Sequence, residues 1–326
     1  AYMNAIDEVG KLNLIKNLNN GVSIKISALH PRYEMRKFKD LESELIPRLI
    51  ELVHYAHSKD VEITIDAEEQ DRLTLSLNII EKLALDKVIK NWTGFGIALQ
   101  AYGKRSINVI HWINKILDKR EKMHLRLVKG AYWDYEIKHA QVFGYEDYPV
   151  YSKKSLTDIS FLLCAKEILK NEKIYAKFAT HNAHTISSVH QLGQGKDYEF
   201  QRLYGMGELL YQSAEKVLNL EKKPSVYAPI GSYKDLLPYL VRRLLENGAN
   251  SSFINRLLDP ETDANWLAEN PAIRIEKEKI DIPLPKNIFT ERKNSSGFDL
   301  SENSNLENLE KSISAHKKNK INAESI

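Results

Sequence analysis

Seven short runs rich in β-branched and aromatic residues alternate along this chain with longer stretches of helical periodicity. The stretches 42–60 and 155–173, for example, carry apolar residues at the spacing of amphipathic helices. Strands separated by helices pair in parallel and are buried on both faces. The pattern predicts an α/β fold, and seven such units in this length favour a closed (βα)8 barrel over an open doubly wound sheet. The seven runs begin at Val22, Val61, Phe95, His124, Tyr175, Tyr198 and Ser225. An eighth strand is harder to locate, and 251–258 is the candidate.

Composition excludes several classes of protein. The chain has 326 residues, 43% of them hydrophobic, and a formal net charge of +3, which suits one large globular domain. Its lysines and arginines are spread along the whole length, so we expect no contact with nucleic acid. No apolar stretch approaches the roughly 20 residues that span a bilayer. We therefore expect a soluble, cytoplasmic protein, and peripheral contact with the inner face of the membrane stays open.

Polar side chains gather where the predicted strands end. In a barrel of parallel strands, the carboxyl ends of the strands carry the chemistry. A buried strand tolerates inward charge badly unless the charge is paired or meets a ligand. A ring of such residues at matching positions therefore indicates a pocket. The ring consists of Lys25, Asp66, Gln100, Arg126, Tyr132, Trp133, Thr180, His181, Asn182 and Tyr227.

The stretch 236–248 predicts a helix with a polar stripe. Tyr239, Arg242, Arg243 and Glu246 share one face through offsets of three, four and seven residues. Two adjacent guanidiniums form a fork suited to gripping a carboxylate. An isolated arginine pair would more often belong to a solvated helix face, but the neighbouring pocket favours a small anionic substrate.

Two other kinds of site are disfavoured. The histidine pairs 54/57 and 181/184 have helical spacing, but no H-E-x-x-H motif or paired cysteine accompanies them, so we expect no metal site. No G-x-S-x-G elbow is present, which argues against a serine hydrolase.

Six motifs in one order, from Val22 to Leu258, together resemble the proline dehydrogenase domain of the bifunctional proline utilization A flavoenzymes. They read SIKISALHPRYE, TIDAEE, LRLVKGAYWDYE, KFATHNAHT, FQRLYGMGE and YAPIGSYKDLLPYLVRRLLENGANSSF. The resemblance implies FAD-dependent oxidation of L-proline to 1-pyrroline-5-carboxylate by hydride transfer from C5 to flavin N5. This is the first step of proline catabolism to glutamate, and its electrons pass to a membrane quinone. No Rossmann G-x-G-x-x-G motif is present, which agrees with a flavin bound by a barrel.

The resemblance also implies roles for individual residues at the cofactor. Arg126 would lie near flavin N5, where a positive charge stabilises the reduced flavin. Phe253 would stack on the adenine. Further contacts to the flavin are implied for Gln100, Val128, Gly130 and Trp133, and contacts along the phosphates and adenosine for Ser152, Lys154, Thr180, His181 and Asn182.

At the substrate, Arg242 and Arg243 would clamp the proline carboxylate, with Lys25 as a third cation. Asp66 is expected to pair with Lys25 or Arg126, and Glu246 to hold one of the arginines near the cofactor. The ring would be walled by Tyr132, Tyr227 and Tyr239. No side chain is required as a base, because the amine proton can pass to water.

The resemblance further divides the chain into three parts. Residues 1–21 form an N-terminal helical segment, 22–275 the barrel, and 276–326 a linker with the start of an incomplete aldehyde dehydrogenase module. The chain thus resembles a fragment of a longer polypeptide, whose relatives carry an acidic helix just before the point where it begins. Its tail has too little apolar content to build a domain and is expected to be mobile by itself.

Two rival classes of function stay open. A barrel aldolase would use Lys25 or Lys129 as a Schiff-base amine, although strand alternation sends Lys129 outward, towards a helix. A catalytically silent barrel would serve only as a docking scaffold. A yellow protein that proline bleaches would exclude both.

Overall fold

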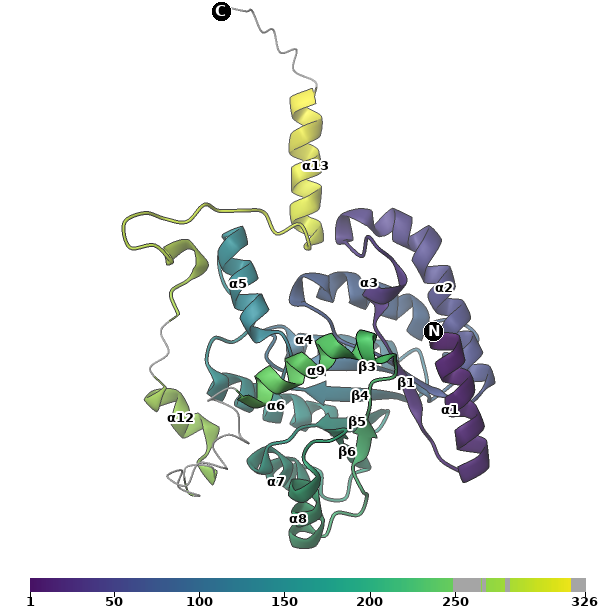
Figure 1. Ribbon diagram of the computed structural model, residues 1–326. Coiled ribbons are helices and arrows are strands. Elements are labelled where there is room, and N and C mark those ends of the chain that lie inside the picture. Colours follow the sequence, from purple (N-terminus) through teal and green to yellow (C-terminus); the bar gives the residue numbers. More distant parts are fainter. Residues whose placement is uncertain (249–264, 266–267, 279–281, 318–326) are drawn as a thin grey trace, which may run out of the picture.

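The computed structural model describes residues 1–248, 265, 268–278 and 282–317, apart from the side chains of 235, 238, 242 and 244–248 (Figure 1). Its seven described strands form one parallel sheet whose order follows the sequence. Each strand begins within one residue of the position that the sequence predicts. The strands are β1 (Gly21–Ile24), β2 (Glu62–Ile65), β3 (Phe95–Gln100), β4 (Met123–Val128), β5 (Ile174–Ala179), β6 (Tyr198–Leu203) and β7 (Ser225–Tyr227).

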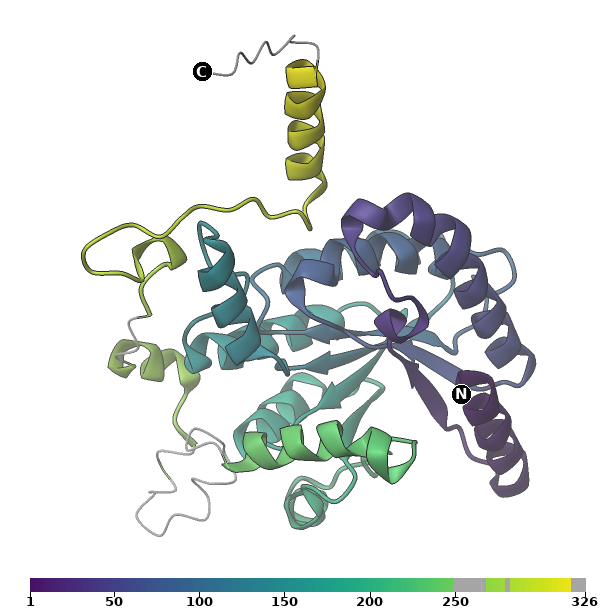
Figure 2. The same cartoon turned by 45° about the horizontal axis from the view of Figure 1, so that its top comes forward.

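The sheet is curled into a half-barrel, as the view of Figure 2 shows. Among the described residues no pairing joins β7 to β1, so the predicted closure into eight strands is not observed. The candidate eighth strand, 251–258, lies outside the described residues. The α/β class and the parallel pairing are confirmed.

Helices connect the strands and cover the outer face of the sheet. In α3, the buried residues Leu75, Ile79, Ile80 and Leu83 form one stripe, and each fully buried side chain of this size contributes roughly 1.5–3 kcal/mol. The central strands are buried over nearly their whole length, as parallel strands with covered faces must be. The helices up to Gly248 are α1 (Tyr2–Lys16), α2 (Phe38–Ser58), α3 (Leu73–Ala84), α4 (Ser106–Leu117), α5 (Trp133–Phe143), α6 (Lys154–Ile168), α7 (Ala183–Leu192), α8 (Glu208–Leu218) and α9 (Tyr233–Gly248).

Short 3-10 turns shape the ends of the first strands. η1 (Ile26–Leu29) directly follows β1, and η3 (Gln70–Arg72) precedes α3. The run predicted as a strand from Val22 therefore ends early, because its second half forms η1. A further turn, η2 (Met35–Lys37), leads into α2.

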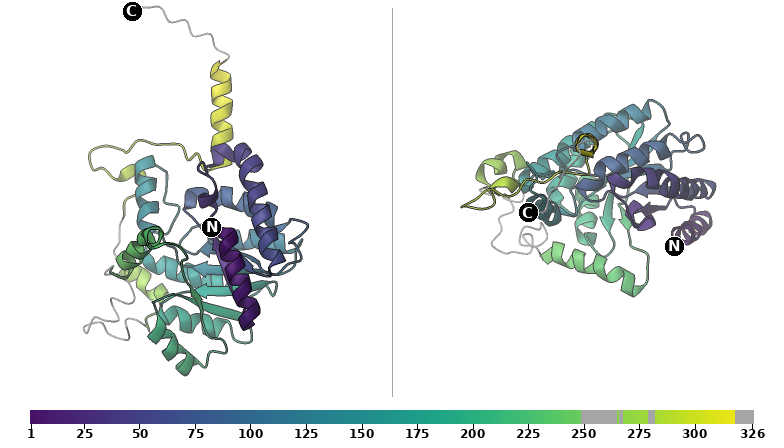
Figure 3. Two further views of the ribbon diagram at one scale, coloured as in Figure 1. Left: turned by 45° about the vertical axis from the view of Figure 1, so that its right-hand side comes forward. Right: turned by 90° about the horizontal axis from the view of Figure 1, so that it is seen from above.

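The C-terminal part contains α12 (Pro271–Lys277), η4 (Pro285–Asn287) and α13 (Asn303–Lys317). The stretch from 282 to 302 is tied to the domain: Tyr148 Oη donates to Pro283 O at 2.7 Å, and Asn294 Nδ2 donates to Gln141 O at 2.7 Å. The expected mobile tail includes α13, which projects away from the domain and buries none of its residues (Figures 1 and 3). No described helix is both long enough and apolar enough to cross a bilayer.

Candidate functional site

A buried arginine from the middle of the sheet forms the centre of the candidate site. Arg126 of β4 is 8% exposed, and its Nη1 lies 2.7 Å from Oδ1 of Asp66, the residue that follows β2. Its Nη2 donates to Ser23 Oγ of β1 at 2.9 Å. Of the two partners predicted for Asp66, Lys25 or Arg126, the structure shows Arg126. The guanidinium thus reaches across the curled sheet from its fourth strand to its first two.

Tyr227 joins this group from β7, the far edge of the sheet. Its hydroxyl donates to Asp66 Oδ2 at 3.1 Å, and the Arg126 guanidinium lies 5.0 Å from the centre of its ring. Burial raises the pKa of Asp66, while the charge of Arg126 and the Tyr227 hydroxyl work against that rise. A β7 side chain can meet a residue at the end of β2 because the sheet curls.

One donor of Arg126 meets no acceptor in the part of the chain that the structure describes. Its Nε is buried and has no hydrogen-bond partner among the described residues, which is costly unless a ligand accepts the bond. Close by in sequence, Gly130 has a φ of 144°, and a Cβ there would lie 2.4 Å from the Tyr102 ring. The loop after β4 therefore approaches its surroundings more closely than a larger residue would allow.

Lys25 lies at the end of β1 and is only partly buried. Its Nζ is 3.9 Å from Glu68 Oε2 and 5.9 Å from the centre of the Tyr132 ring. The predicted partner Asp66 is thus taken by Arg126, and Glu68 is the carboxylate that accompanies Lys25. Tyr132 immediately precedes α5, and its ring lies beside the Lys25 ammonium.

Gln100 ends β3 and joins two loops. Its Nε2 donates to Glu68 O at 2.8 Å, and its Oε1 accepts from Ala131 N at 3.2 Å. Val128 ends β4 and accepts, through its carbonyl, from Ala101 N at 2.8 Å. Trp133 begins α5 and donates from Nε1 to Tyr151 O at 2.9 Å. These contacts fix the loop after β4, where the flavin contacts are predicted.

The residues Thr180, His181 and Asn182 follow β5 and lead into α7. Asn182 caps this helix by accepting from Thr185 N at 2.9 Å. His181 Nε2 accepts from Leu203 N at 3.1 Å. Burial and, to a smaller extent, the charges of Arg243 and Arg202 lower the pKa of His181 to about 4. A neutral imidazole and a helix N-terminus therefore meet at this end of the sheet, where an anion is favoured.

Ser152 and Lys154 lie at the N-terminus of α6, which packs beside α7. Lys154 is the first residue of that helix. One helix donor is already engaged, because Ser155 N donates to a carboxylate oxygen of Glu278 at 3.3 Å. The residues predicted to contact the phosphates and adenosine thus lie at the starts of two neighbouring helices, α6 and α7.

Helix α9 carries the predicted carboxylate clamp. The Arg243 guanidinium lies 5.6 Å from the centre of the Tyr239 ring, and it is close enough to His181 to lower the pKa of that imidazole. The side chains of Arg242 and Glu246 lie outside the described residues, as does Phe253 altogether. The pairing of both guanidiniums on one carboxylate therefore stays a prediction.

Lys129 points away from this group of residues. Its Nζ forms an ion pair with Asp158 of α6, as strand alternation predicts. A Schiff-base role for Lys129 would require this pair to break. Over the described ranges, no group of three His, Cys, Asp or Glu residues is arranged to hold a metal ion.

Three contacts of the site escaped prediction. Ser23 shares a strand face with Lys25, two residues on, so alternation could have identified it. Glu68 stands in the motif TIDAEE, two residues after Asp66, so its place beside a strand end was a usable signal. Tyr2, whose hydroxyl accepts from Lys25 N at 3.0 Å, has no local signal because it is 23 residues away.

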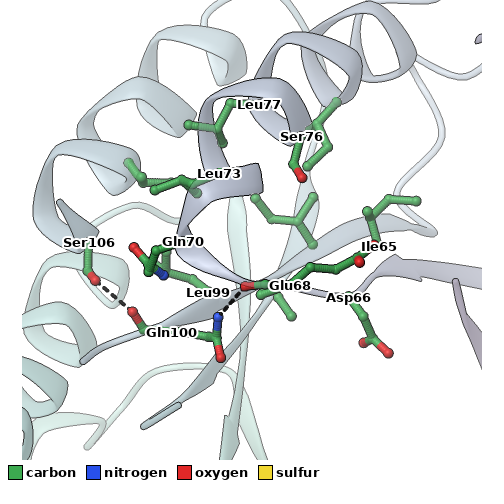
Figure 4. Close-up of a pocket in the computed structure, with 15 residues that line it drawn as sticks. Ile65, Asp66, Glu68, Gln70, Leu73, Ser76, Leu77, Leu99, Gln100 and Ser106 are labelled. Carbon is green, nitrogen blue, oxygen red and sulfur yellow. Dashed lines mark hydrogen bonds between the residues drawn. The ribbon is translucent and has the colours of Figure 1, made fainter. Parts of the chain in front are cut away.

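A small internal cavity of about 30 Å³ lies between the sheet and α3, lined in part by Leu73, Ser76 and Leu77 (Figure 4). In this view the Asp66 carboxylate points away from those three side chains. A space of this size holds about one water molecule. Its lining also includes Asp66, Glu68 and Gln100, so the cavity borders the candidate site.

Comparisons with known proteins agree on one family. The family model described as proline dehydrogenase matches residues 1–256. The bifunctional protein PutA of Klebsiella aerogenes is 44% identical over 335 residues, which cover 96% of this chain and 26% of that protein. Its counterpart in Escherichia coli K12 is 43% identical, with 96% and 25% covered.

Solved structures agree with these sequences. A crystal structure of mutant proline utilization A from Bradyrhizobium japonicum matches with a TM-score of 0.91 at 42% identity, covering 96% of this chain and 33% of that one. The corresponding protein of Bdellovibrio bacteriovorus, inactivated by N-propargylglycine, matches with a TM-score of 0.85 at 26% identity, covering 97% of this chain and 34% of that one. The chain spans about a quarter of the length of the curated relatives that it matches.

Proposed function

Because the chain belongs to the proline dehydrogenase family, we propose that it oxidises L-proline to 1-pyrroline-5-carboxylate with bound FAD as the hydride acceptor. The observation that carries the proposal is the buried Arg126, whose Nε lacks an acceptor among the described residues. A buried guanidinium with a donor to spare suits a ligand that becomes negatively charged during the reaction.

The residues present fit FAD. Arg126 would lie beside the reacting ring, with Gln100, Val128, Gly130 and Trp133 holding the loop that contacts it. The starts of α6 and α7, with Ser152, Lys154, Thr180, His181 and Asn182, would face the phosphates and adenosine. Phe253 would stack on the adenine. When bound, FAD supplies the atom N5, which accepts a hydride.

Substrate binding would rest on three cations and three aromatic walls. Lys25, Arg242 and Arg243 hold the proline carboxylate, and Glu246 orients one of the arginines. Tyr132, Tyr227 and Tyr239 enclose the ring, exclude water and reject larger amino acids by shape. Fixed orientation of this kind lowers the barrier by up to roughly 7–11 kcal/mol in well-ordered systems.

Proline loses two hydrogens in the reaction. C5 gives up a hydride, and the amine nitrogen gives up a proton, which passes to water as the C5–N double bond forms. Asp66 is already engaged with Arg126 and Tyr227, so its role is to set the charge of the pocket. No base from this chain is required.

The longer relatives extend the proposal beyond this domain. We expect the seven strands to be completed by an eighth, with residues 22–275 as the dehydrogenase barrel. Residues 276–326 would lead into a covalently linked aldehyde dehydrogenase module, as the bifunctional relatives suggest. Electrons would pass to a quinone, which requires transient contact of a cytoplasmic protein with the inner face of the membrane.

The visible absorption spectrum of the purified protein tests this function. We expect a yellow protein whose flavin band bleaches when proline is added without oxygen. A colourless protein that borohydride and substrate label on lysine would instead identify a Schiff-base enzyme. A colourless protein that is not labelled on lysine either would support the non-catalytic docking scaffold.

A further inference from the structure

Glu68 is a carboxylate buried beside the predicted substrate cation. Its side chain is 1% exposed, and it lies near the ends of β2 and β3 next to Gln100 (Figure 4). We propose that Glu68 is a positioning residue, which fixes Lys25 where it can meet the carboxylate of the substrate. The inference rests on the proposed function and adds to it the group that orients one of its cations.

Both oxygens of the Glu68 carboxylate are used by neighbouring turns. Oε1 accepts from Ser27 N in η1 at 2.9 Å, and Oε2 accepts from Arg72 Nη1 in η3 at 2.6 Å. Charge-assisted bonds of this length are stronger than neutral ones. Glu68 therefore holds the turn that begins immediately after Lys25.

The main chain of Lys25 is held by a hydrogen bond, whereas its side-chain ammonium can still donate hydrogen bonds. Its backbone N donates to Tyr2 Oη at 3.0 Å. Its Nζ is 3.9 Å from Glu68 Oε2, too far for a hydrogen bond, and its side chain is 41% exposed. Within the described part of the chain, no hydrogen bond of this ammonium is found. The attraction to Glu68 keeps the ammonium in place while its donors stay available to an anion.

The main chain of Glu68 is linked through Gln100 to the loop after β4. Its carbonyl accepts from Gln100 Nε2 at 2.8 Å, and Gln100 Oε1 accepts from Ala131 N at 3.2 Å. A change in the side chain of Glu68 leaves this carbonyl in place. Substitution should therefore affect substrate binding and spare the loop predicted to contact the flavin.

The test is Glu68→Asp in the FAD-loaded protein. The shorter side chain keeps its charge but draws the carboxylate back by about 1.5 Å, one carbon–carbon bond, so it cannot reach both turns. We expect KM for proline to rise about tenfold, within the range of coupled neighbours, with kcat and flavin content unchanged. Calorimetry with tetrahydrofuran-2-carboxylate, which has the ring and carboxylate without the amine, should show the same loss of affinity.

Two controls make the result specific. Glu69→Asp shortens the adjacent carboxylate, which also pairs with Arg72 but does not contact Lys25, and should leave KM within twofold. In a Lys25→Met background, Glu68→Asp should have no further effect on KM, because the residue through which it acts is gone. A Glu68→Asp protein with parental KM, or an effect that persists in full without Lys25, overturns the proposal.

If Glu68→Asp does not fold, a second variant, Glu68→Gln, tests the same proposal. Glu68→Gln has the same shape but offers one acceptor oxygen to two donors, so KM should again rise, and an unchanged or lower KM overturns the proposal. A parent protein whose flavin proline does not reduce would overturn the proposed function and this inference together. Failure of the Glu68 variants alone, with Lys25→Met impaired, would remove only the inference.

Discussion

Two buried cations stand at matching positions on neighbouring strands of the sheet, and their surroundings differ. Arg126 of β4 and Lys177 of β5 are register partners, each 8% exposed. Arg126 pairs with Asp66, just past the carboxyl end of β2, whereas Lys177 pairs with Glu62, the first residue of β2, at 2.6 Å. One cation therefore serves the carboxyl edge of the sheet and the other its amino edge.

The buried cation at the amino edge is paired twice. Lys177 has a second carboxylate, Glu199, at 3.6 Å, so two anions surround one buried ammonium. At the carboxyl edge, by contrast, Arg126 keeps a buried donor without a partner among the described residues, and Lys25 stays partly exposed. The paired charge of Lys177 supports the fold, whereas the spare donor of Arg126 at the carboxyl edge is suited to a ligand.

The largest expected effect is on stability at the amino edge. Lys177→Met would leave the largely buried carboxylates of Glu62 and Glu199, 16% and 17% exposed, without their cation, which should cost about 3–5 kcal/mol of unfolding free energy. Chemical denaturation would measure the loss, and KM for proline in the folded fraction should not change. The exposed Lys196→Met is the control, expected within about 0.5 kcal/mol of the parent. A large rise in KM would contradict the division between the edges.

Arg126→Met should act mainly on the reaction. Removing the guanidinium that is proposed to lie beside the flavin is expected to slow flavin reduction by about 10²–10³, the usual cost of losing one preorganised donor at a developing charge. Stopped-flow absorbance under anaerobic conditions measures the rate. Arg126→Lys keeps the charge without the planar fork and should fall between parent and Met variant. If Arg126→Met reduced its flavin as fast as the unmodified protein, the reaction would not take place at the carboxyl edge beside Arg126.

The α9 arginines should control substrate affinity. Arg242→Met or Arg243→Met is expected to raise the proline concentration for half-maximal flavin reduction by about 10²-fold, within the cost of truncating a desolvated charge pair. FAD should stay bound in both variants. Arg36→Met, an exposed arginine of η2, serves as the control and should leave proline saturation unchanged. Normal saturation in both α9 variants would remove the clamp from the proposed function.

The last effect concerns pH and the carboxyl edge. Burial lowers the pKa of His181 to about 4, while an unfolded chain protonates near pH 6.5. The unfolded state then binds more protons between these values, so stability is present above pH 6.5 and is lost as pH falls towards 4. The loss should be up to about 3 kcal/mol. In His181→Asn, the unfolding free energy measured by chemical denaturation should depend less on pH across this range. An unaltered slope of unfolding free energy against pH would show that His181 does not stay neutral.

Much of the fold follows from local patterns. Strand starts were predictable within one residue because β-branched runs and helical periodicity are set by neighbours along the chain. Alternation also predicted that Lys129 points outward towards a helix, and the polar strand ends predicted one ring of side chains that includes Arg126, Asp66 and Tyr227. The eight-stranded closure went beyond what the described strands show, because a strand count needs pairing partners that sequence spacing does not specify.

What the sequence by itself determined is therefore the class of fold, the family and the edge of the sheet on which the chemistry lies. Only the tertiary structure decided which carboxylate accompanies which cation: Asp66 with Arg126, Glu68 with Lys25, and Glu62 with Lys177. The physical reason is that these pairs join strands and turns separated by 43 to 115 residues. The curl of the sheet and the direction of each long side chain select among several nearby partners, and neither is written in any local run of residues.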